Sequence, residues 1–285
     1  METAENAEPL SGDKLYQQRA RKALPILVRQ ALACTPITYE DLADELAMPN
    51  PRNLNYVLGS IGTALGNLSE DWEEEVPPVQ CLVVNKTTRL PGEGIAWFLS
   101  DLKTYKKLPM KQKREVVQAE LTRIYSYKHW LEVLKYFGLK PDASDYNNLQ
   151  TKAARGYGGE GPEHKALKEF ICTHPESVGI SAAFGNGEEE HPLPSGDSID
   201  VLFQKGSEQI AIEVKPASSG EADIVRGLYQ CIKYVAVLNA RQSVERKPQN
   251  ARAILALGGN FPRSLVGLRN MLGVSVCENV SAVAG

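Results

Sequence analysis

Apolar residues in the first third of the chain recur with the period of a helix. The pattern predicts a helix over residues 13–33, broken near Pro25 because proline lacks the backbone donor that a helix needs. A second helix is predicted over residues 40–48, where Thr38 can cap the first turn and Asp41 lies three positions later. A third helix follows a tight turn, with helical spacing between its apolar residues Leu54, Val57, Leu58, Ile61 and Leu65.

Two helices joined by a tight turn, with another helix before them, predict a helix-turn-helix unit. After an acidic loop, the sequence VQCLVVNKTTRLPGEGI predicts a strand, a turn and a returning strand. That is the shape of a wing, with Lys86 and Arg89 at its tip. The segments expected in this part are a flexible tail over 1–12, a winged helix-turn-helix domain over 13–96 and a helical connector over 97–150.

The pattern changes after a polar, glycine-rich stretch near residue 150, where we place a domain boundary. Helices are predicted over residues 163–174, 221–240 and 264–271. Strands are predicted over residues 178–184, 199–203, 209–215, 251–257 and 274–280. The order αβββαβ, followed by one more helix and strand, predicts an α/β (α+β) domain over 151–285 with a mixed sheet.

Composition excludes several classes of protein. No run of 18 apolar residues exists and the first residues lack an apolar signal core, so we expect a cytoplasmic protein without a membrane partner. The five cysteines are far apart, which predicts reduced thiols. Residues 156–161 fit G-x-G-x-x-G, but no strand precedes them, so we expect no nucleotide cofactor. Residues 101–129 are basic and suit either a solvated helix face or a phosphate-binding surface.

Two acids and a lysine lie inside strand-like stretches, where charged groups are costly unless paired or coordinated. Glu213 and Lys215 share one face of their strand, because alternate residues point the same way. If Gln204 pairs with Gln209 across the turn, Asp200 lies directly opposite Glu213. Two carboxylates so placed can hold one divalent cation, so we predict a Mg²⁺ site at which Mn²⁺ can substitute.

These residues resemble the PD-(D/E)XK nuclease superfamily, which has the restriction-endonuclease-like fold. Its pattern is an acid on the first helix, Asp on the second strand and E-x-K on the third, and Glu163, Asp200 and Glu213-Val214-Lys215 follow that order. The resemblance implies the catalytic residues Asp200, Glu213, Lys215, Glu163 and Gln230. The expected metal ligands are Asp200, Glu213, the Val214 carbonyl and Glu163.

Two details complete this resemblance. Ile199 stands where the superfamily name has proline, and Asp197 is a weaker alternative for the acid of the second strand. Many members carry Q-x-x-x-Y on the following helix, which residues 230–234 match. One side of that helix carries the further DNA contacts that we expect, Arg226, Lys233 and Tyr234.

The N-terminal part resembles the winged helix of DNA alkyltransferase and alkyltransferase-like proteins. The family patterns T-Y-G-D-x-A, N-P-R and P-C-H-R-V are matched by residues 38–43, 50–52 and 80–84. Cys81 falls where the family has its alkyl acceptor, but Leu82 replaces the histidine, so we expect a structural thiol and no alkyl transfer. What the resemblance implies is DNA docking through Arg52, Asn53, Asn55, Lys86 and Arg89.

The sequence as a whole therefore predicts a Mg²⁺-dependent DNA endonuclease, positioned on duplex DNA by a winged helix and acting in DNA repair or in defence against foreign DNA. Two alternatives stay open. In one, the nuclease-like domain binds DNA or regulates without cutting. In the other, the winged helix docks a nuclease subunit on a protein partner. The sequence does not distinguish a monomer from a homodimer.

Overall fold

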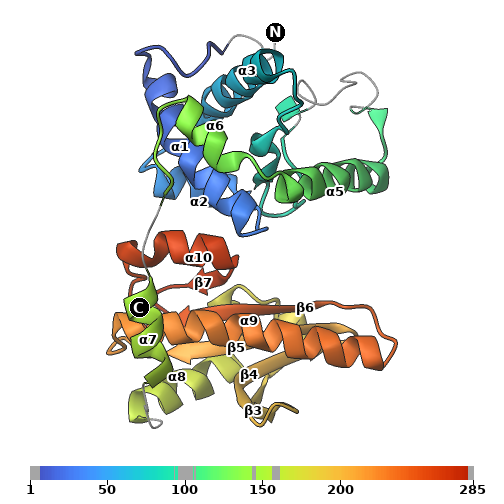
Figure 1. The fold of residues 1–285 in the computed structure, drawn as a ribbon. Coiled ribbons are helices and arrows are strands. Elements are labelled where there is room, and N and C mark those ends of the chain that lie inside the picture. Colours follow the sequence, from blue (N-terminus) through green and yellow to red (C-terminus); the bar gives the residue numbers. More distant parts are fainter. Residues whose placement is uncertain are drawn as a thin grey trace. The chain divides into compact units, whose positions relative to one another are not determined.

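The computed structural model describes residues 7–92, 94–95, 105, 107–142, 146–155 and 161–281. The chain divides into two compact units, Met1–Ala143 and Ser144–Gly285 (Figure 1), so the division falls slightly before the boundary expected near 150. The start of the expected tail, the first part of the expected connector and the glycine-rich stretch 156–160 lie outside the described residues. No helix in the described part of the chain combines the length and apolarity that crossing a membrane requires.

The N-terminal unit is built from helices around one apolar core. The helices are α1 Leu15–Leu32, α2 Tyr39–Glu45, α3 Leu54–Trp72, α5 Met110–Ser126 and α6 Trp130–Tyr136, with short 3-10 helices η1 Pro51–Asn53 and η2 Val79–Leu82. Trp130 is buried in this core, and its indole donates to the Ile124 carbonyl at 2.8 Å. The described helices of the expected connector, α5 and α6, therefore belong to the N-terminal core.

The predicted break at Pro25 is wrong, because α1 continues through it. Proline inside a helix removes one hydrogen bond and crowds the preceding turn, at a cost of about 3 kcal/mol. Leu24, Ile26 and Leu27 beside it are all buried in the core. Tertiary packing of this face holds the helical conformation that the local sequence disfavours.

Residues 7–12 are packed on this unit, unlike the flexible tail that the sequence predicts. Leu10 is buried, and the Ala7 carbonyl accepts a hydrogen bond from the Thr63 hydroxyl at 3.1 Å. Arg21 donates to the carbonyls of Leu10 and Gly12. Residues 7–12 are mostly polar, which predicts a flexible tail, but their few apolar side chains pack against the core.

The second and third predicted helices are present as α2 and α3, but the segment after them differs from the prediction. Thr38 caps α2 by accepting from the Asp41 amide at 3.1 Å, as predicted. The segment from Val79 forms η2 and then the short strand β2 Val83–Val84. Strand β2 pairs in parallel with β1 Ile37–Thr38, which follows α1 in the chain. The sequence predicts a wing here, in which a first strand pairs with a returning strand. In the structure, β2 pairs instead with β1, which is distant in the chain. Part of the predicted returning strand lies outside the described residues.

The C-terminal unit contains a five-stranded mixed sheet, as predicted. Its strands lie in the order β3 Glu188–Pro192, β4 Ser198–Lys205, β5 Glu208–Lys215, β6 Ala251–Leu257 and β7 Ser275–Cys277. Neighbours are antiparallel from β3 to β5 and parallel from β5 to β7. Gln204 pairs with Gln209, which confirms the predicted register of the β4–β5 hairpin.

The first strand of this sheet lies elsewhere than the sequence predicts. Residues 178–184 are apolar, yet they form parts of two 3-10 helices, Pro175–Val178 and Ala182–Phe184, with Gly179 between them at a φ of 71°. The actual strand, β3, has the sequence EEEHP and lies at the edge of the sheet. Charged residues are characteristic of edge strands, where they discourage pairing with other chains. The pattern of apolar residues therefore predicts a strand at 178–184, where none forms, and does not predict β3.

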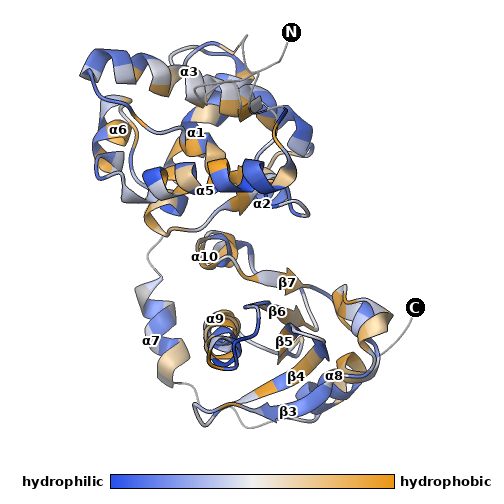
Figure 2. Ribbon diagram, turned by 90° about the vertical axis from the view of Figure 1, so that its right-hand side faces the viewer, coloured by the Kyte–Doolittle hydropathy of each residue, from blue (hydrophilic) through white to orange (hydrophobic). Residues whose placement is uncertain are grey.

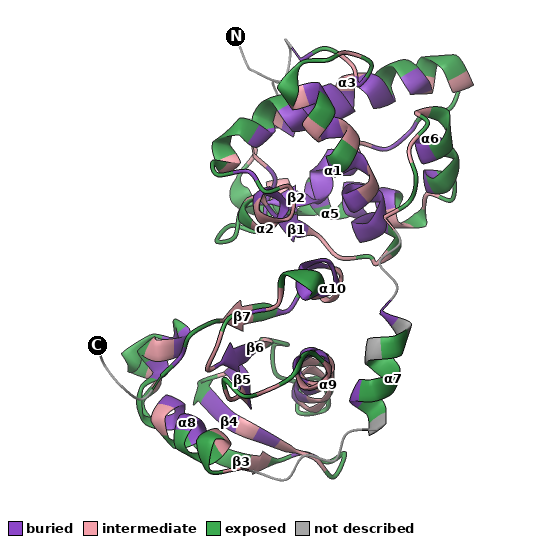
Figure 3. Ribbon diagram, turned by 90° about the vertical axis from the view of Figure 1, so that its left-hand side faces the viewer, coloured by how far each residue is buried: buried purple, intermediate pink, exposed green. Residues whose placement is uncertain are grey.

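Helices cover both faces of the sheet (Figure 2). Helix α8 Pro162–Thr173 packs on one face against β4 and β5, through residues such as Ile171 and Ile212. Helix α9 Glu221–Val244 packs on the other face, together with α10 Val266–Leu272 and α7 Asn147–Arg155. Figure 3 shows buried residues along the central strands between these helix layers. The alternation along β5 directs Val214 toward α8 and its neighbours Glu213 and Lys215 toward α9.

Candidate active site

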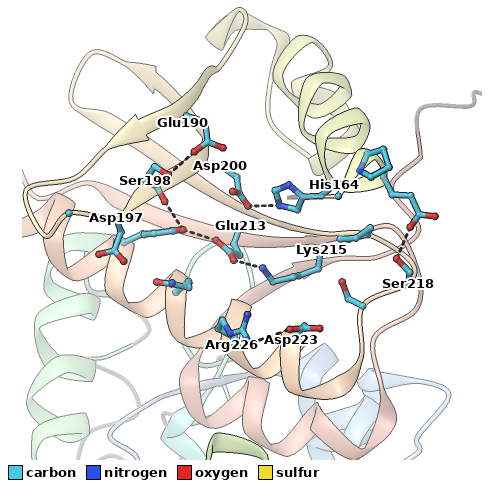
Figure 4. A pocket seen from close by; sticks show the side chains of 18 residues that line it. His164, Glu190, Asp197, Ser198, Asp200, Glu213, Lys215, Ser218, Asp223 and Arg226 are labelled. Atoms are coloured by element: carbon cyan, nitrogen blue, oxygen red, sulfur yellow. Dashed lines mark hydrogen bonds and ion pairs between the residues drawn. The ribbon is translucent and has the colours of Figure 1, made fainter. Parts of the chain in front are cut away.

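A cavity of about 850 Å³ opens in the C-terminal unit where α8, β3, β4, β5 and the start of α9 meet (Figure 4). It brings together most of the residues that the sequence singles out. These are Glu163, Asp200, Glu213, Lys215, Arg226, Gln230 and Tyr234. Of the other two that the sequence places in this domain, Val214 is fully buried and Lys233 lines a neighbouring cavity on α9.

Asp200 lies on β4 at the position that the hairpin register predicts. The described ladder pairs Val201 with Ile212, and continuing this register puts Asp200 opposite Glu213. The Asp200 carboxylate accepts a hydrogen bond from the Val214 amide at 2.7 Å. The strands therefore bring the carboxylates of Asp200 and Glu213 into one cavity from adjacent backbones.

Glu213 is buried and held by two donors. Its carboxylate accepts from Lys215 Nζ at 2.6 Å and from the Tyr234 hydroxyl at 2.6 Å. Burial is the main cause that raises the pKa of Glu213, and the charge of Asp200 raises it further, whereas Lys215 and Tyr234 act in the opposite direction. Two neighbouring carboxylates are thus kept close in a site that disfavours their simultaneous ionisation.

Comparison of the chain with protein-family models, curated proteins and solved structures gives no match.

Tyr234 lines the cavity from α9, on the side of the helix for which the sequence predicts phosphate and active-site contacts. The sequence predicts a DNA contact, but the Tyr234 side chain is buried on α9. Its hydroxyl lies 2.6 Å from Glu213 Oε2 and 3.0 Å from the Ser198 carbonyl oxygen. Burial, and after it the charge of Glu213, raises the pKa of Tyr234, so the hydroxyl keeps the proton that it donates. Tyr234 therefore supports Glu213 from the side of α9.

Gly227 lets α9 approach the site closely. A Cβ atom at this position would lie 2.7 Å from Leu255 Cδ1, 3.3 Å from Lys215 Cε and 3.4 Å from Glu213 Cγ. Any larger residue would press on the two side chains that form the Glu213–Lys215 pair. A glycine one helical turn before Gln230 and Cys231 is thus part of what positions the site.

The sequence predicts Glu163 of the first helix as the residue near Asp200, but the neighbouring residue His164 lies there instead. Glu163 lines the cavity but accepts a hydrogen bond from the Ser218 hydroxyl at 2.6 Å. His164 Nε2 lies 3.4 Å from Asp200 Oδ2. Both residues lie in the first turn of α8 and point in different directions around its axis. How α8 is rotated on the sheet therefore decides which of them faces the Asp200 carboxylate. Helical spacing alone could not distinguish them.

Sequence reasoning also missed Glu190 on β3, which lines the same cavity. Glu190 pairs with Lys168 of α8, a lysine that is only 3% exposed, and accepts from the Ser198 hydroxyl at 2.7 Å. The register of β3 against β4 puts Glu190 at the level of Asp200, and its φ of 52° interrupts the regular strand there. The sequence feature that could have indicated Glu190 is the acidic run before His191, but the pattern of apolar residues does not predict a strand there.

The cavity has an excess of negative charge. Among the described residues, six carboxylates line it: Glu163, Glu190, Asp197, Asp200, Glu213 and Asp223. The cations that line it are Lys215 and Arg226, and Arg226 is 3.4 Å from Asp223. Four of these carboxylates are in ion pairs, Glu190 with Lys168, Asp197 with Lys233, Glu213 with Lys215 and Asp223 with Arg226, so the excess comes from Glu163 and Asp200.

The oxygen donors and their charge suit a hard divalent cation such as Mg²⁺. Asp200 and Glu213 each lie one residue beyond Val201 and Ile212, the last pair of the β4–β5 ladder, and both carboxylates already accept hydrogen bonds that orient them. Among the residues that the structure describes, no three His, Cys, Asp or Glu side chains are gathered closely enough to enclose an ion. The fit therefore rests on the Asp200–Glu213 pair and on the surplus of negative charge.

The other expected DNA contacts are distributed over both units. Arg52, Asn53 and Asn55 are exposed around the start of α3, and Lys86 and Arg89 are exposed on a turn that the Asn85 side chain caps. In the C-terminal unit, Arg226 Nε donates to the Ala153 carbonyl at 2.9 Å, and Lys233 forms an ion pair with Asp197. The pairing with Lys233 is the main cause that lowers the pKa of Asp197.

Cys81 has the surroundings of a structural thiol. Its side chain is fully buried in the N-terminal core. Burial is the main cause that raises the pKa of Cys81, and the nearby Glu120 adds to it. Because the thiolate is the reactive form, a buried thiol with a raised pKa is a poor nucleophile.

Proposed function

We propose that this protein is a Mg²⁺-dependent DNA endonuclease that hydrolyses phosphodiester bonds in the cavity of its C-terminal unit. The observation that carries the proposal is the pair of carboxylates, Asp200 and Glu213, on neighbouring strands with Lys215 bonded to Glu213. The order α8, β3, β4, β5, α9, β6 supports the restriction-endonuclease-like fold that the sequence resemblance implies.

In this reaction a water oxygen bonds to phosphorus and one P–O ester bond breaks, which releases a sugar hydroxyl. Asp200 and Glu213 would hold Mg²⁺, or Mn²⁺ in its place, with the Val214 carbonyl as a further oxygen ligand, and Glu163 would first have to leave its hydrogen bond with Ser218 to join them. The bound ion lowers the pKa of a water and offsets phosphate charge. Lys215 would orient the attacking water, while Tyr234 and His164 keep the two carboxylates in position.

For the N-terminal unit we propose a winged-helix role in docking the enzyme on DNA. The support is the capped α2, the turn through η1 and the exposed Arg52, Asn53 and Asn55 at the start of α3. Lys86 and Arg89 on their turn would contact phosphates.

Cleavage of supercoiled plasmid and of single-stranded DNA, each with and without Mg²⁺, tests the hydrolytic proposal. Asp200→Ala and Glu213→Ala should each lower the rate by about a thousandfold or more, because a charge-stabilising group is worth several kcal/mol at a reacting phosphate. Lys215→Ala should lower the rate less, and DNA binding should persist in all three variants. Glu208→Ala is the matched control, since it removes an acid from the other end of the same strand.

Cleavage by wild type in EDTA, or full activity of Asp200→Ala, would refute the proposal. One observation favours the second candidate function, a nucleic-acid-binding domain that does not cut. Asp200 and Glu213 both have protein hydrogen-bond donors, which is what a structural network requires. That candidate predicts DNA binding by wild type without cleavage at any concentration of Mg²⁺ or Mn²⁺.

A further inference from the structure

A second cavity lies beside the candidate active site, between α7 and α9. Its volume is about 370 Å³. Its described walls come from Gln150, Ala153 and Ala154 of α7 and from Arg226, Tyr229, Gln230 and Lys233 of α9. Figure 3 shows α7 running beside α9 on the side away from the sheet. Alanines and a tyrosine ring give this cavity apolar walls, in contrast to the acidic site next to it.

The two cavities meet at shared side chains. Arg226 and Gln230 line both of them. Arg226 is fixed at the junction, since its Nε donates to the Ala153 carbonyl at 2.9 Å and its Nη2 lies 3.4 Å from Asp223. The Arg226 and Gln230 side chains therefore form a wall that the two cavities have in common.

The polar ends of the second cavity are two cations that each have an acidic partner in the protein, Arg226 with Asp223 and Lys233 with Asp197. Arg226 and Lys233 are two turns apart on one side of α9, about 10 Å along the helix axis. Tyr229 lies between them, and its hydroxyl is hydrogen-bonded to Gln150 across the cavity. Proteins that bind single strands combine aromatic rings, on which bases stack, with basic side chains that follow the backbone.

We propose that this cavity receives an unpaired nucleobase next to the phosphodiester that is cleaved, so that the substrate is single-stranded nucleic acid. The proposal rests on the proposed hydrolytic function and specifies its substrate. A base in a duplex is stacked on both faces and paired along one edge, so it cannot lie against Tyr229 between two helices unless it leaves the stack. Duplex DNA would then engage the N-terminal unit, and the strand to be cut would have to be unpaired.

Binding of labelled oligonucleotides in EDTA, measured by fluorescence anisotropy, separates the cavity from the chemistry. Ala154→Trp should fill the cavity and weaken single-strand binding roughly tenfold, the effect of losing one base stacked on an aromatic ring. Asn148→Trp is the matched control, because Asn148 is exposed on α7 and does not line the cavity. Binding of a blunt duplex should be unchanged in both variants.

Tyr229 gives a second test that does not depend on a bulky substitution. Tyr229→Phe keeps the ring and should bind the single strand as wild type does, whereas Tyr229→Leu should bind it roughly tenfold more weakly. A single strand with abasic residues should bind wild type more weakly than a normal strand, and should lose this difference in Ala154→Trp.

Two outcomes would overturn the inference: single-strand affinity within twofold of wild type in both Ala154→Trp and Tyr229→Leu, or equal affinity of wild type for normal and abasic strands. If cleavage still requires Asp200 in that case, the hydrolytic function stands and the base-binding cavity is rejected. If the binding pattern is as expected but wild type never cleaves, the cavity stands and the hydrolytic function is rejected.

Discussion

The charged residues for which we propose a function differ in exposure between the two units. In the N-terminal unit, Arg52, Lys86 and Arg89 are exposed around a single large apolar core. In the C-terminal unit, the apolar residues form smaller clusters on both faces of a sheet. Asp200 and Glu213 of this unit line a cavity. Exposed cations can attract a polyanion but do not hold it in one geometry, whereas buried carboxylates are placed accurately at a cost in stability. This contrast is the basis on which we propose docking for the first unit and chemistry for the second.

The largest expected effect in this comparison comes from replacing a glycine in the C-terminal unit, and a glycine in the N-terminal unit serves as the control. Gly227→Ala should slow cleavage at least tenfold and lower the free energy of unfolding by about 1–3 kcal/mol, because the added methyl presses on Leu255, Lys215 and Glu213. Gly66→Ala in α3 meets no atom within 4 Å, so it should raise stability by up to about 1 kcal/mol and leave cleavage unchanged. Denaturant unfolding and plasmid cleavage measure both. Equal behaviour of the two variants would show that α9 does not position the site.

A smaller effect should separate the buried acids of the two units. Burial is the main cause that raises the pKa of Glu213, and it also raises that of Glu120 in the N-terminal unit. A folded-state pKa above the ordinary 4.5 means that the native protein binds an extra proton, so wild-type stability should fall as pH rises from 4.5 through the folded pKa. Glu213→Gln and Glu120→Gln have no such proton to release, so each should gain stability relative to wild type over that window and show no further change below pH 4.5.

Mg²⁺ distinguishes the two acids. Added Mg²⁺ should stabilise wild type and Glu120→Gln, because both keep the Asp200–Glu213 pair, and should have little effect on Glu213→Gln. Urea unfolding in EDTA and in Mg²⁺, at pH values on both sides of the titration window, measures these differences. Equal stabilisation of all three proteins would contradict a metal site at Glu213.

The smallest expected effect concerns the exposed cations of the N-terminal unit. Lys86→Ala combined with Arg89→Ala should weaken duplex binding and lower the slope of log affinity against log salt by up to about two, one for each phosphate that is no longer neutralised. The rate of cleavage on a saturating substrate should stay unchanged. Duplex affinity that is the same as in wild type at several salt concentrations would remove this turn from the docking surface.

The sequence predicts best what depends on neighbouring residues. The Thr38 cap and the β4–β5 register both follow from a few adjacent positions, and the structure has both. Because the predicted register is correct, the sequence also brings Asp200 and Glu213 to one level of the sheet.

What the sequence could not predict depends on contacts between distant segments. Pro25 stays helical because its neighbours are buried, and β3 is a strand although it is highly charged. The exchange of Glu163 for His164 beside Asp200 is set by how α8 is rotated on the sheet. The sequence puts Tyr234 on the correct helix, but its burial depends on how closely α9 packs, which Gly227 permits.

The sheet topology has a consequence for the order in which the site assembles during folding. Strands β4 and β5 are joined by a two-residue turn, so Asp200 and Glu213 can meet as soon as a local hairpin closes, on a microsecond timescale. The parallel pairing of β5 with β6 must wait for the long crossover through α9, because contacts that are distant in sequence form slowly. Tyr234 and Gly227 arrive with that crossover. We therefore expect the nascent chain to bring its two acids together before it supplies the hydroxyl that holds Glu213, so that α9 is the element that completes the site.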